Sequence, residues 1–149
     1  KGENVSTSEV ARALLSCEDD DEARVMTEED SSQYFVEAVV YGVEVPGHPG
    51  RAGMATVVLR KPNEDSSWQT SVWRSLQAEL PRYAQPLFVR IASEIEKTGT
   101  QKYKKNKLQD ESFLKCGSDS VYFRDDASEM FVPLDETTRH NVLSGKQRL

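Results

Sequence analysis

The sequence predicts a small α+β domain in which helices pack on one β-sheet. Three observations support this prediction: two apolar, β-branched segments flank a turn rich in proline and glycine, a third apolar segment follows, and two amphipathic patterns with helical spacing interleave with them. The chain has 149 residues, of which 37% are hydrophobic. That length fits one ordinary domain and is too short for two of full size.

A first helix is predicted near the N-terminal end. Ser6-Thr7-Ser8-Glu9 is a capping box, in which the Ser6 hydroxyl accepts from the Glu9 amide and the Glu9 carboxylate reaches back to the Ser6 amide. Apolar residues at helical spacing follow at Val10, Ala13 and Leu14. The pattern ends at Cys17, and the acidic, serine-rich residues 18–33 are expected to form an exposed loop inserted into the domain.

A β-hairpin is predicted next. Residues 34–45 are almost continuously apolar, which is typical of a strand buried on both faces. Residues 46–50 contain two prolines and two glycines, which force a turn. Residues 52–59 then supply the second strand, and the two segments together are predicted to pair as a hairpin.

A second amphipathic helix and a third strand complete the predicted unit of three strands with flanking helices. Ser66 and Gln69 form another capping signal, and Pro81 ends the helix. The apolar residues at near-helical spacing are Trp68, Val72, Trp73, Leu76 and Leu80. Residues 87–91 form the third strand. Three segments follow in the tail: apolar residues 121–123, apolar residues 131–134, and a short polar helix from about Asp135 to Leu143.

Composition argues against several classes of function. The formal net charge of -6 argues against general adhesion to nucleic acid or to an anionic membrane. No stretch approaches the roughly 20 apolar residues that span a bilayer. Cys17 and Cys116 lack Cys-x-x-Cys spacing and a nearby histidine, so neither a zinc site nor a disulfide scaffold is predicted. The chain begins at Lys1 without an initiator methionine, a signal peptide or a transit helix, so we expect a fragment of a longer protein.

One segment departs from the acidic balance of the chain. Residues 97–107 contain five lysines in eleven positions. A solvated basic loop is the plainest interpretation. A nucleic-acid patch would need more interleaved aromatic and arginine side chains than Tyr103 alone supplies. A third interpretation is a phosphate site, because Thr98-Gly99-Thr100 is a hydroxyl-rich turn that can present a lysine ammonium, although no P-loop pattern is present.

Other polar residues carry weaker signals. His48 lies in the proline and glycine turn and His140 in the tail, and without a paired nucleophile both are interpreted as surface histidines. Glu37 lies inside an apolar strand. We interpret it as a strand-edge carboxylate that reaches solvent, with an ion pair to a basic residue at a domain interface as the alternative.

Three segments together resemble a known family: residues 1–10, residues 41–55, which contain Tyr41-Gly42-Val43-Glu44-Val45-Pro46-Gly47-His48-Pro49-Gly50-Arg51, and Lys97-Thr98-Gly99-Thr100-Gln101-Lys102. They are similar to the C-terminal domain of fatty acid transport proteins and very long-chain acyl-CoA synthetases, which are adenylate-forming enzymes. The resemblance implies a small C-terminal lid domain at residues 1–110, with a short N-terminal hairpin remnant. Residues 111–149 are then a family-specific extension packed on the lid, and a large N-terminal domain is absent.

The resemblance also implies an activity for the whole protein. Such enzymes use ATP to activate a fatty acid as an acyl-adenylate and then transfer the acyl group to CoA, releasing AMP and pyrophosphate. The implied ligands are ATP, CoA and Mg²⁺, held mainly by the N-terminal AMP-binding domain, which is the partner of the lid. The lid rotates about a hinge expected a few residues before Lys1, and the isolated 149 residues are expected to be inactive.

The same resemblance assigns roles to particular residues. Lys102 matches the adenylation lysine, whose ammonium lies between the fatty-acid carboxylate and the α-phosphate and stabilises the charge that develops during attack. Thr98, Gly99 and Thr100 shape its loop. Lys1 and Gly2 match the segment that meets CoA in the thioester-forming state. Gln101 departs from the glycine that many relatives carry before this lysine.

Two other functions stay open on the sequence. The parent is either a synthetase coupled to fatty acid uptake or a transport protein in which this domain is a non-catalytic interaction module, and a free-standing binding module is a third possibility. Membrane association is expected only through the rest of the parent, at the endoplasmic reticulum, plasma membrane or peroxisome. The ending Lys146-Gln147-Arg148-Leu149 is only loosely similar to a peroxisomal signal.

Overall fold

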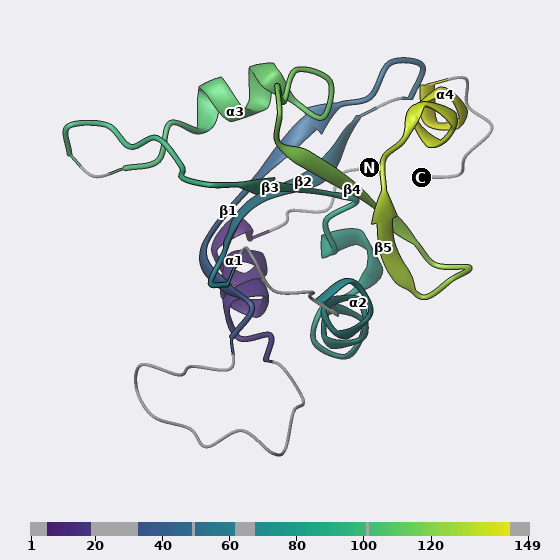
Figure 1. Ribbon diagram of the computed structural model, residues 1–149, viewed down its shortest axis with the longest axis horizontal. Helices are drawn as coiled ribbons and strands as arrows, with labels where there is room; N and C mark the ends of the chain where they lie inside the picture. Colours follow the sequence, from purple (N-terminus) through teal and green to yellow (C-terminus); the bar gives the residue numbers. More distant parts are fainter. Residues whose placement is uncertain (1–5, 19–32, 49, 62–67, 101, 144–149) are drawn as a thin grey trace.

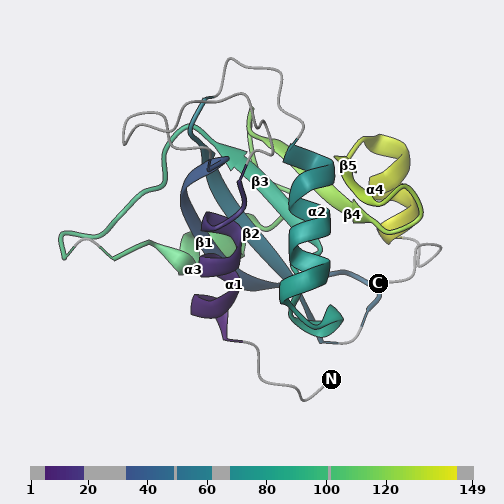
Figure 2. The same cartoon turned by 90° about the horizontal axis from the view of Figure 1, so that it is seen from below.

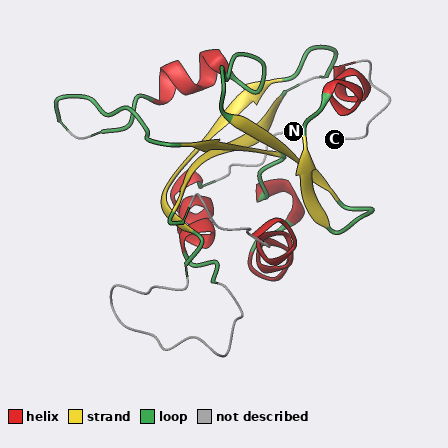
Figure 3. Ribbon diagram, in the orientation of Figure 1, coloured by secondary structure: helices red, strands yellow, loops and turns green. Residues whose placement is uncertain are grey.

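The computed structural model describes residues 6–18, 33–48, 50–61, 68–100 and 102–143. Within these residues, five strands form one sheet in the order β1-β2-β3-β4-β5, and helices lie on both of its faces (Figure 3). The strands are β1 (Phe35–Glu44), β2 (Arg51–Leu59), β3 (Phe88–Ala92), β4 (Ser120–Asp125) and β5 (Met130–Pro133). The helices are α1 (Thr7–Leu15), α2 (Trp68–Glu79), α3 (Lys105–Glu111) and α4 (Glu136–Leu143), with a short 3-10 turn η2 (Arg82–Ala84).

The sheet is mixed. β1 and β2 pair antiparallel, β2 and β3 pair parallel, and the remaining neighbours pair antiparallel. α2 makes the crossover between the parallel strands and lies beside α1 on one face of the sheet (Figures 1 and 2). α3 lies on the opposite face, and α4 lies near the turn between β1 and β2 (Figure 1). The result is a central sheet with apolar residues buried on both sides.

Two apolar clusters fill these two interfaces. Beneath α1 and α2, Trp68 packs edge-on against Phe35 and Tyr122, with ring centroids 5.8 and 4.8 Å apart. On the other face, Phe88 stacks on Phe113 with centroids 4.2 Å apart. Successive residues of β1 enter opposite clusters, as alternation along a strand requires. The predicted burial of this strand on both faces is therefore confirmed.

Local signals in the sequence are also found in the structure. The Ser6 hydroxyl accepts from the Glu9 amide at 3.3 Å and caps α1. The turn between β1 and β2 holds Gly47 and Gly50 at positive φ, 83° and 76°, where a residue with a Cβ would be strained. α2 ends at Glu79, just before Pro81, and Asp135 caps α4 by accepting from the Thr138 amide at 2.7 Å.

The predicted α+β fold is confirmed. The sheet has five strands among the described residues, where about three were predicted. Residues 121–123 and 131–134 were predicted only as apolar tail segments. Residues 121–123 form the middle of β4 and residues 131–133 form most of β5, and the two strands extend the sheet from the free edge of β3. The helix α3 within the lysine segment was not predicted. The N-terminal hairpin remnant, the Ser66 capping signal and most of the acidic loop lie outside the described residues, although a bridge between Glu18 and Gln33 joins the two ends of that loop.

Candidate functional site

The lysine segment forms a narrow hairpin that leaves the body of the domain after β3 (Figure 1, left). The Thr98 amide donates to the Lys102 carbonyl at 2.6 Å, and Lys97 and Tyr103 form an antiparallel bridge. One step further from the tip, the Lys104 amide donates to the Glu96 carbonyl at 3.2 Å. These contacts close the chain into a tip on a paired stem. We call the tip, residues 98–102, the lysine loop, and the paired residues 96–97 and 103–104 its stem.

The Thr98 side chain organises the tip. Its hydroxyl accepts from the backbone amides of Thr100 and Lys102, each at 3.3 Å, and lies 2.8 Å from the Thr100 hydroxyl. A threonine hydroxyl that holds backbone groups in this way stabilises a turn. Gly99 makes no close approach, because a Cβ built there would meet nothing within 4 Å. The close contacts of this turn therefore come from Thr98, and they leave room for a side chain at Gly99.

Lys102 is exposed, and its backbone is held on both sides by Thr98. Within the described part of the chain, its ammonium has no hydrogen-bond or ion-pair partner. The other lysines of the segment differ: Lys97, Lys104 and Lys107 pair with carboxylates, and Lys105 donates to the Thr7 hydroxyl at 3.3 Å. A held backbone and an unpaired ammonium suit Lys102 to binding an anion.

Glu37 connects the base of the lysine loop to the sheet. Its Oε2 accepts from the Tyr103 hydroxyl at 3.0 Å and lies 3.7 Å from Lys97 Nζ, and this Nζ lies 5.3 Å from the centre of the Tyr103 ring. Glu37 does lie on an edge strand with a side chain that is 30% exposed, as the sequence predicts, but the structure adds two partners from a hairpin some 60 residues later. Burial and the bond to Glu37 raise the pKa of Tyr103, so the phenol stays protonated as a donor.

Glu96, which precedes the lysine loop, forms ion pairs with two lysines that follow it. Its carboxylate lies 2.8 Å from Lys107 Nζ and 3.5 Å from Lys104 Nζ. The hydrogen bond and charge of Lys107, followed by the charge of Lys104, lower the pKa of this carboxyl. These side chains are about half exposed, so water and salt weaken their attraction.

A buried arginine lies on β3, the strand that precedes the lysine loop. Arg90 on β3 donates from Nε to Asp119 at 2.8 Å and from one terminal nitrogen to Glu111 at 3.1 Å. Burial lowers the pKa of Arg90, but the bonds to Asp119 and Glu111 outweigh it and the net pKa is raised. Sequence analysis missed this cluster. The signal available was an arginine among the apolar residues of a predicted strand, where a charge needs a partner.

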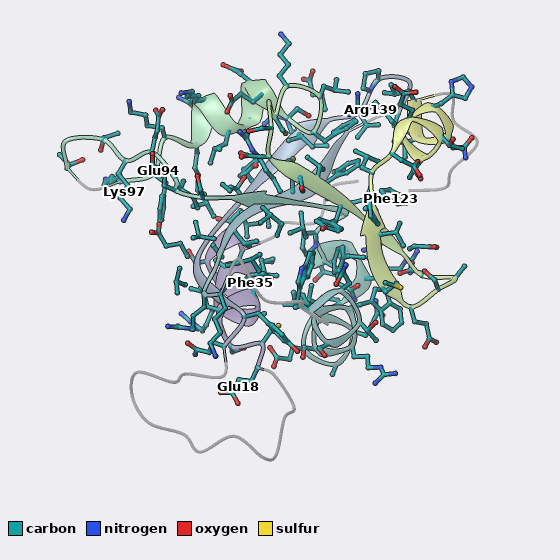
Figure 4. The ribbon with its side chains drawn as sticks, viewed as in Figure 1. Glu18, Phe35, Glu94, Lys97, Phe123 and Arg139 are labelled. Carbon is teal, nitrogen blue, oxygen red and sulfur yellow. The ribbon has the colours of Figure 1, made fainter. Side chains whose placement is uncertain are left out.

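The other residues singled out from the sequence lie away from the lysine loop or outside the described residues. Lys1, Gly2 and Gln101 lie outside the described residues. His48 lies 3.0 Å from the Val142 carbonyl and joins the turn between β1 and β2 to α4. A groove of about 630 Å³, lined by Phe113, Tyr122 and Arg139 among others, lies away from the lysine loop, since Figure 4 shows Lys97 and Arg139 at opposite ends of the domain.

Comparison with a family model gives a match over residues 30–102 to the AMP-binding enzyme C-terminal domain. This match ends on Lys102 and includes the hairpin strands and the lysine loop. Among the described residues, no helix has the length and apolar character needed to cross a membrane.

Curated relatives match along the whole chain. Long-chain fatty acid transport protein 6 of Mus musculus is 40% identical over 100% of this chain and 22% of its own length. Long-chain fatty acid transport protein 3 of Homo sapiens is 35% identical over 100% of this chain and 20% of its own length. The chain thus spans about a fifth of the length of these relatives.

Solved structures share the fold. A fatty acyl CoA synthetase of Mycobacterium tuberculosis superposes with a TM-score of 0.53 at 25% identity, over 74% of this chain and 18% of that one. ATP-bound MatB of Rhodopseudomonas palustris gives a TM-score of 0.56 at 20% identity, over 76% of this chain and 19% of that one.

Proposed function

The chain belongs to the AMP-binding enzyme C-terminal domain family, in the group of the fatty acid transport proteins and acyl-CoA synthetases, and from this premise we propose that it is the catalytic lid of an ATP-dependent fatty acyl-CoA synthetase. The whole enzyme would convert a long-chain or very-long-chain fatty acid, ATP and CoA into acyl-CoA, AMP and pyrophosphate. The observation that carries this proposal is that Lys102 has a held backbone and that its ammonium pairs with none of the residues the structure describes.

Lys102 is proposed as the adenylation lysine. A carboxylate that attacks an α-phosphate is repelled by it, and a single ammonium within reach of both anions lowers that repulsion and stabilises charge during attack. Its exposure on a protruding loop lets it enter the active site of another domain. Thr98, Gly99 and Thr100 are proposed to shape the loop, which the hydrogen bonds of the Thr98 hydroxyl support.

Among the described residues, the lysine loop offers a cation to an anionic substrate, and no group of three or more His, Cys, Asp or Glu side chains can hold a metal. Mg²⁺ and most contacts to ATP are proposed to belong to the large N-terminal domain, which is the proposed partner of the lid. Lys1 and Gly2 are proposed to meet CoA in the thioester-forming orientation.

The proposed limits of the lid are residues 1–110, with residues 111–149 as an extension packed on it. The pairing of β4 with β3 supports this packing. The fatty acid and the membrane are proposed to contact the rest of the protein, at the endoplasmic reticulum, plasma membrane or peroxisome. The names of the relatives support a link to fatty acid uptake.

The test separates the two half-reactions in the full-length protein. Fatty-acid-dependent exchange of pyrophosphate into ATP reports adenylation, and CoA thioester formation from preformed acyl-adenylate reports the second step. We expect Lys102→Ala to lower exchange by about 100-fold or more and to leave the second step within about twofold. Lys115→Ala, an exposed lysine outside the loop, is the matched control.

Other outcomes contradict the proposal. If Lys102→Ala and Lys115→Ala behave alike, Lys102 is not the adenylation lysine. If the wild-type protein shows no exchange with any fatty acid tested, the domain is a non-catalytic interaction module of a transport protein. Acyl-CoA formation by the isolated 149 residues would contradict the assignment of the ATP and fatty-acid sites to another domain.

A further inference from the structure

We propose that Glu37 is a positioning residue for Lys102: from β1 it holds both ends of the lysine loop and so fixes where the ammonium of Lys102 is presented. This inference rests on the proposed adenylation role of Lys102. The partners of Glu37 are Tyr103 and Lys97 and not Lys102 itself, so it acts on Lys102 through these two residues.

The carboxylate contacts both strands of the hairpin stem. Lys97 is the last residue before the tip and Tyr103 is the first residue after it, so the two flank residues 98–102. Glu37 Oε2 accepts from the Tyr103 hydroxyl at 3.0 Å and lies 3.7 Å from Lys97 Nζ. Because Tyr103 follows Lys102 directly in the chain, a shift of Tyr103 moves the backbone of Lys102 with it.

Glu37 lies on a paired strand. β1 pairs with β2, with a shift of register between Phe35 and Glu37, and the residue after Glu37 is buried in the cluster beneath α1 and α2. The Tyr103 ring packs against the cluster on the opposite face. Glu37 is only 30% exposed, so its attraction for Lys97 is less screened than that of the outer stem pairs of Glu96, whose carboxylate is 53% exposed.

Besides the Glu37 contacts, the packing of Tyr103 on the apolar cluster and the bond from Lys105 to the Thr7 hydroxyl hold the base of the lysine loop. Thr98, Gly99, Thr100 and Lys102 are all exposed, and the loop extends away from the sheet (Figures 1 and 4). The internal hydrogen bonds of Thr98 hold the shape of the tip, but they do not connect it to the domain. The Glu37 contacts therefore help to set its orientation, because they join both sides of the stem to β1. Misplacing a catalytic group by about 1 Å can cost up to about 100-fold in rate.

Three variants in the full-length protein test the contribution of each contact. Glu37→Ala removes both contacts, and Tyr103→Phe removes the hydroxyl donor while keeping the ring. Glu37→Gln keeps an acceptor for Tyr103 but loses the charge that faces Lys97. We expect Glu37→Ala to lower the kcat of adenylation about tenfold, with KM for ATP and the thioester step changed by less than about twofold, and Glu37→Gln to retain more activity than Glu37→Ala.

The double variant Glu37→Ala/Tyr103→Phe adds a further test, because both changes break the same bond. Its loss should be smaller than the product of the two single losses. Glu44→Ala, an exposed carboxylate at the other end of β1, is the control and should keep wild-type rates. A loss that is equal in both half-reactions, or multiplicative in the double variant, overturns the positioning role.

A second readout does not depend on catalysis. In the 149-residue chain, backbone ¹⁵N relaxation should show that Glu37→Ala increases the motion of Gly99 and Lys102, while thermal unfolding shows the domain still folded. Unchanged relaxation overturns the inference. The two proposals fail separately: if Lys102→Ala leaves adenylation intact, the adenylation role fails. If only the Glu37 variants are without effect, the positioning role fails and the proposed function stands.

Discussion

The indole of Trp73 donates from Nε1 to Asp126 Oδ1 at 3.0 Å, and this bond ties α2 to the connection between β4 and β5. The same carboxylate lies 2.6 Å from Arg82 and 3.4 Å from Arg124. One acidic side chain thus joins α2 and η2, which are neighbours in the sequence, to the end of β4 some 40 residues later. Since β4 and β5 lie at the open edge of the sheet, Asp126 fixes that edge to the helix beneath it.

Asp126→Ala is expected to destabilise the domain by about 1–3 kcal/mol. The change leaves the Trp73 N–H without its acceptor, and it removes the carboxylate charge 3.4 Å from the buried Arg124 guanidinium. An orphaned donor costs more than a hydrogen bond contributes. Urea unfolding of the 149-residue chain measures the loss. Asp110→Ala, an exposed aspartate on α3, should lie within about 0.5 kcal/mol of wild type. Equal midpoints for the two variants contradict the role of Asp126.

The same carboxylate predicts a pH dependence. Burial raises the pKa of Asp126, but the bond from Trp73 and the charges of Arg124 and Arg82 outweigh burial, and the net pKa lies below its ordinary value of 3.8. The folded state therefore binds fewer protons there than the unfolded state. Its contribution to stability is complete above pH 3.8 and is lost as the pH falls through the lowered pKa. Acid titration of unfolding should be shallower in Asp126→Ala, and parallel curves contradict this assignment.

Most of the fold could be predicted because its signals are local. The capping box of α1, the turn at Gly47 and Gly50 and the apolar run of β1 each depend on residues close in sequence. β4 and β5 were missed because short strands pair only when a partner edge is present, and that edge is supplied by β3. α3 was missed because Leu108 alone of its seven residues is buried, which gives no amphipathic pattern.

The candidate site was found in part. The lysine loop and Lys102 were identified from charge and from a resemblance, since the sequence motif is local. The partners of Glu37 were missed because Lys97 and Tyr103 lie about 60 residues away, and only the packing of the hairpin against β1 brings them together. Arg90 was missed because its partners Asp119 and Glu111 lie 29 and 21 residues away in the sequence.

Arg90→Met is expected to destabilise the domain by about 2–4 kcal/mol. The substitution removes the ion pairs that join β3 to α3 and to the start of β4, and it leaves Asp119 and Glu111 without their partner. Combining Arg90→Met with Asp119→Asn and Glu111→Gln should recover part of the loss, because the uncompensated charges are then gone. Urea unfolding measures both variants. A triple variant less stable than Arg90→Met would show that uncompensated charge is not the cause.

Both cysteines are expected to resist thiol reagents in the folded chain. Burial raises the pKa of Cys17 to about 11, assisted by the charge of Glu79 and opposed by a bond with Ser75, and burial also raises the pKa of Cys116. Little thiolate therefore exists at pH 8, and both groups are shielded from solvent. A chromogenic disulfide reagent should react slowly with the native chain and release two equivalents in urea. Rapid reaction of either thiol before unfolding would contradict the buried positions.

The Thr98 hydroxyl predicts a clear contrast between two substitutions. Thr98→Val keeps the shape of the side chain but removes the acceptor for the Thr100 and Lys102 amides, whereas Thr98→Ser keeps it. In the full-length protein, Thr98→Val should lower adenylation about tenfold and Thr98→Ser less than about threefold, with thioester formation unchanged in both. Equal activity of Val and Ser at this position would mean that the stem alone holds the tip.

Because Glu37 orients the stem and Thr98 shapes the tip, losses from Glu37→Ala and Thr98→Val should multiply in the double variant.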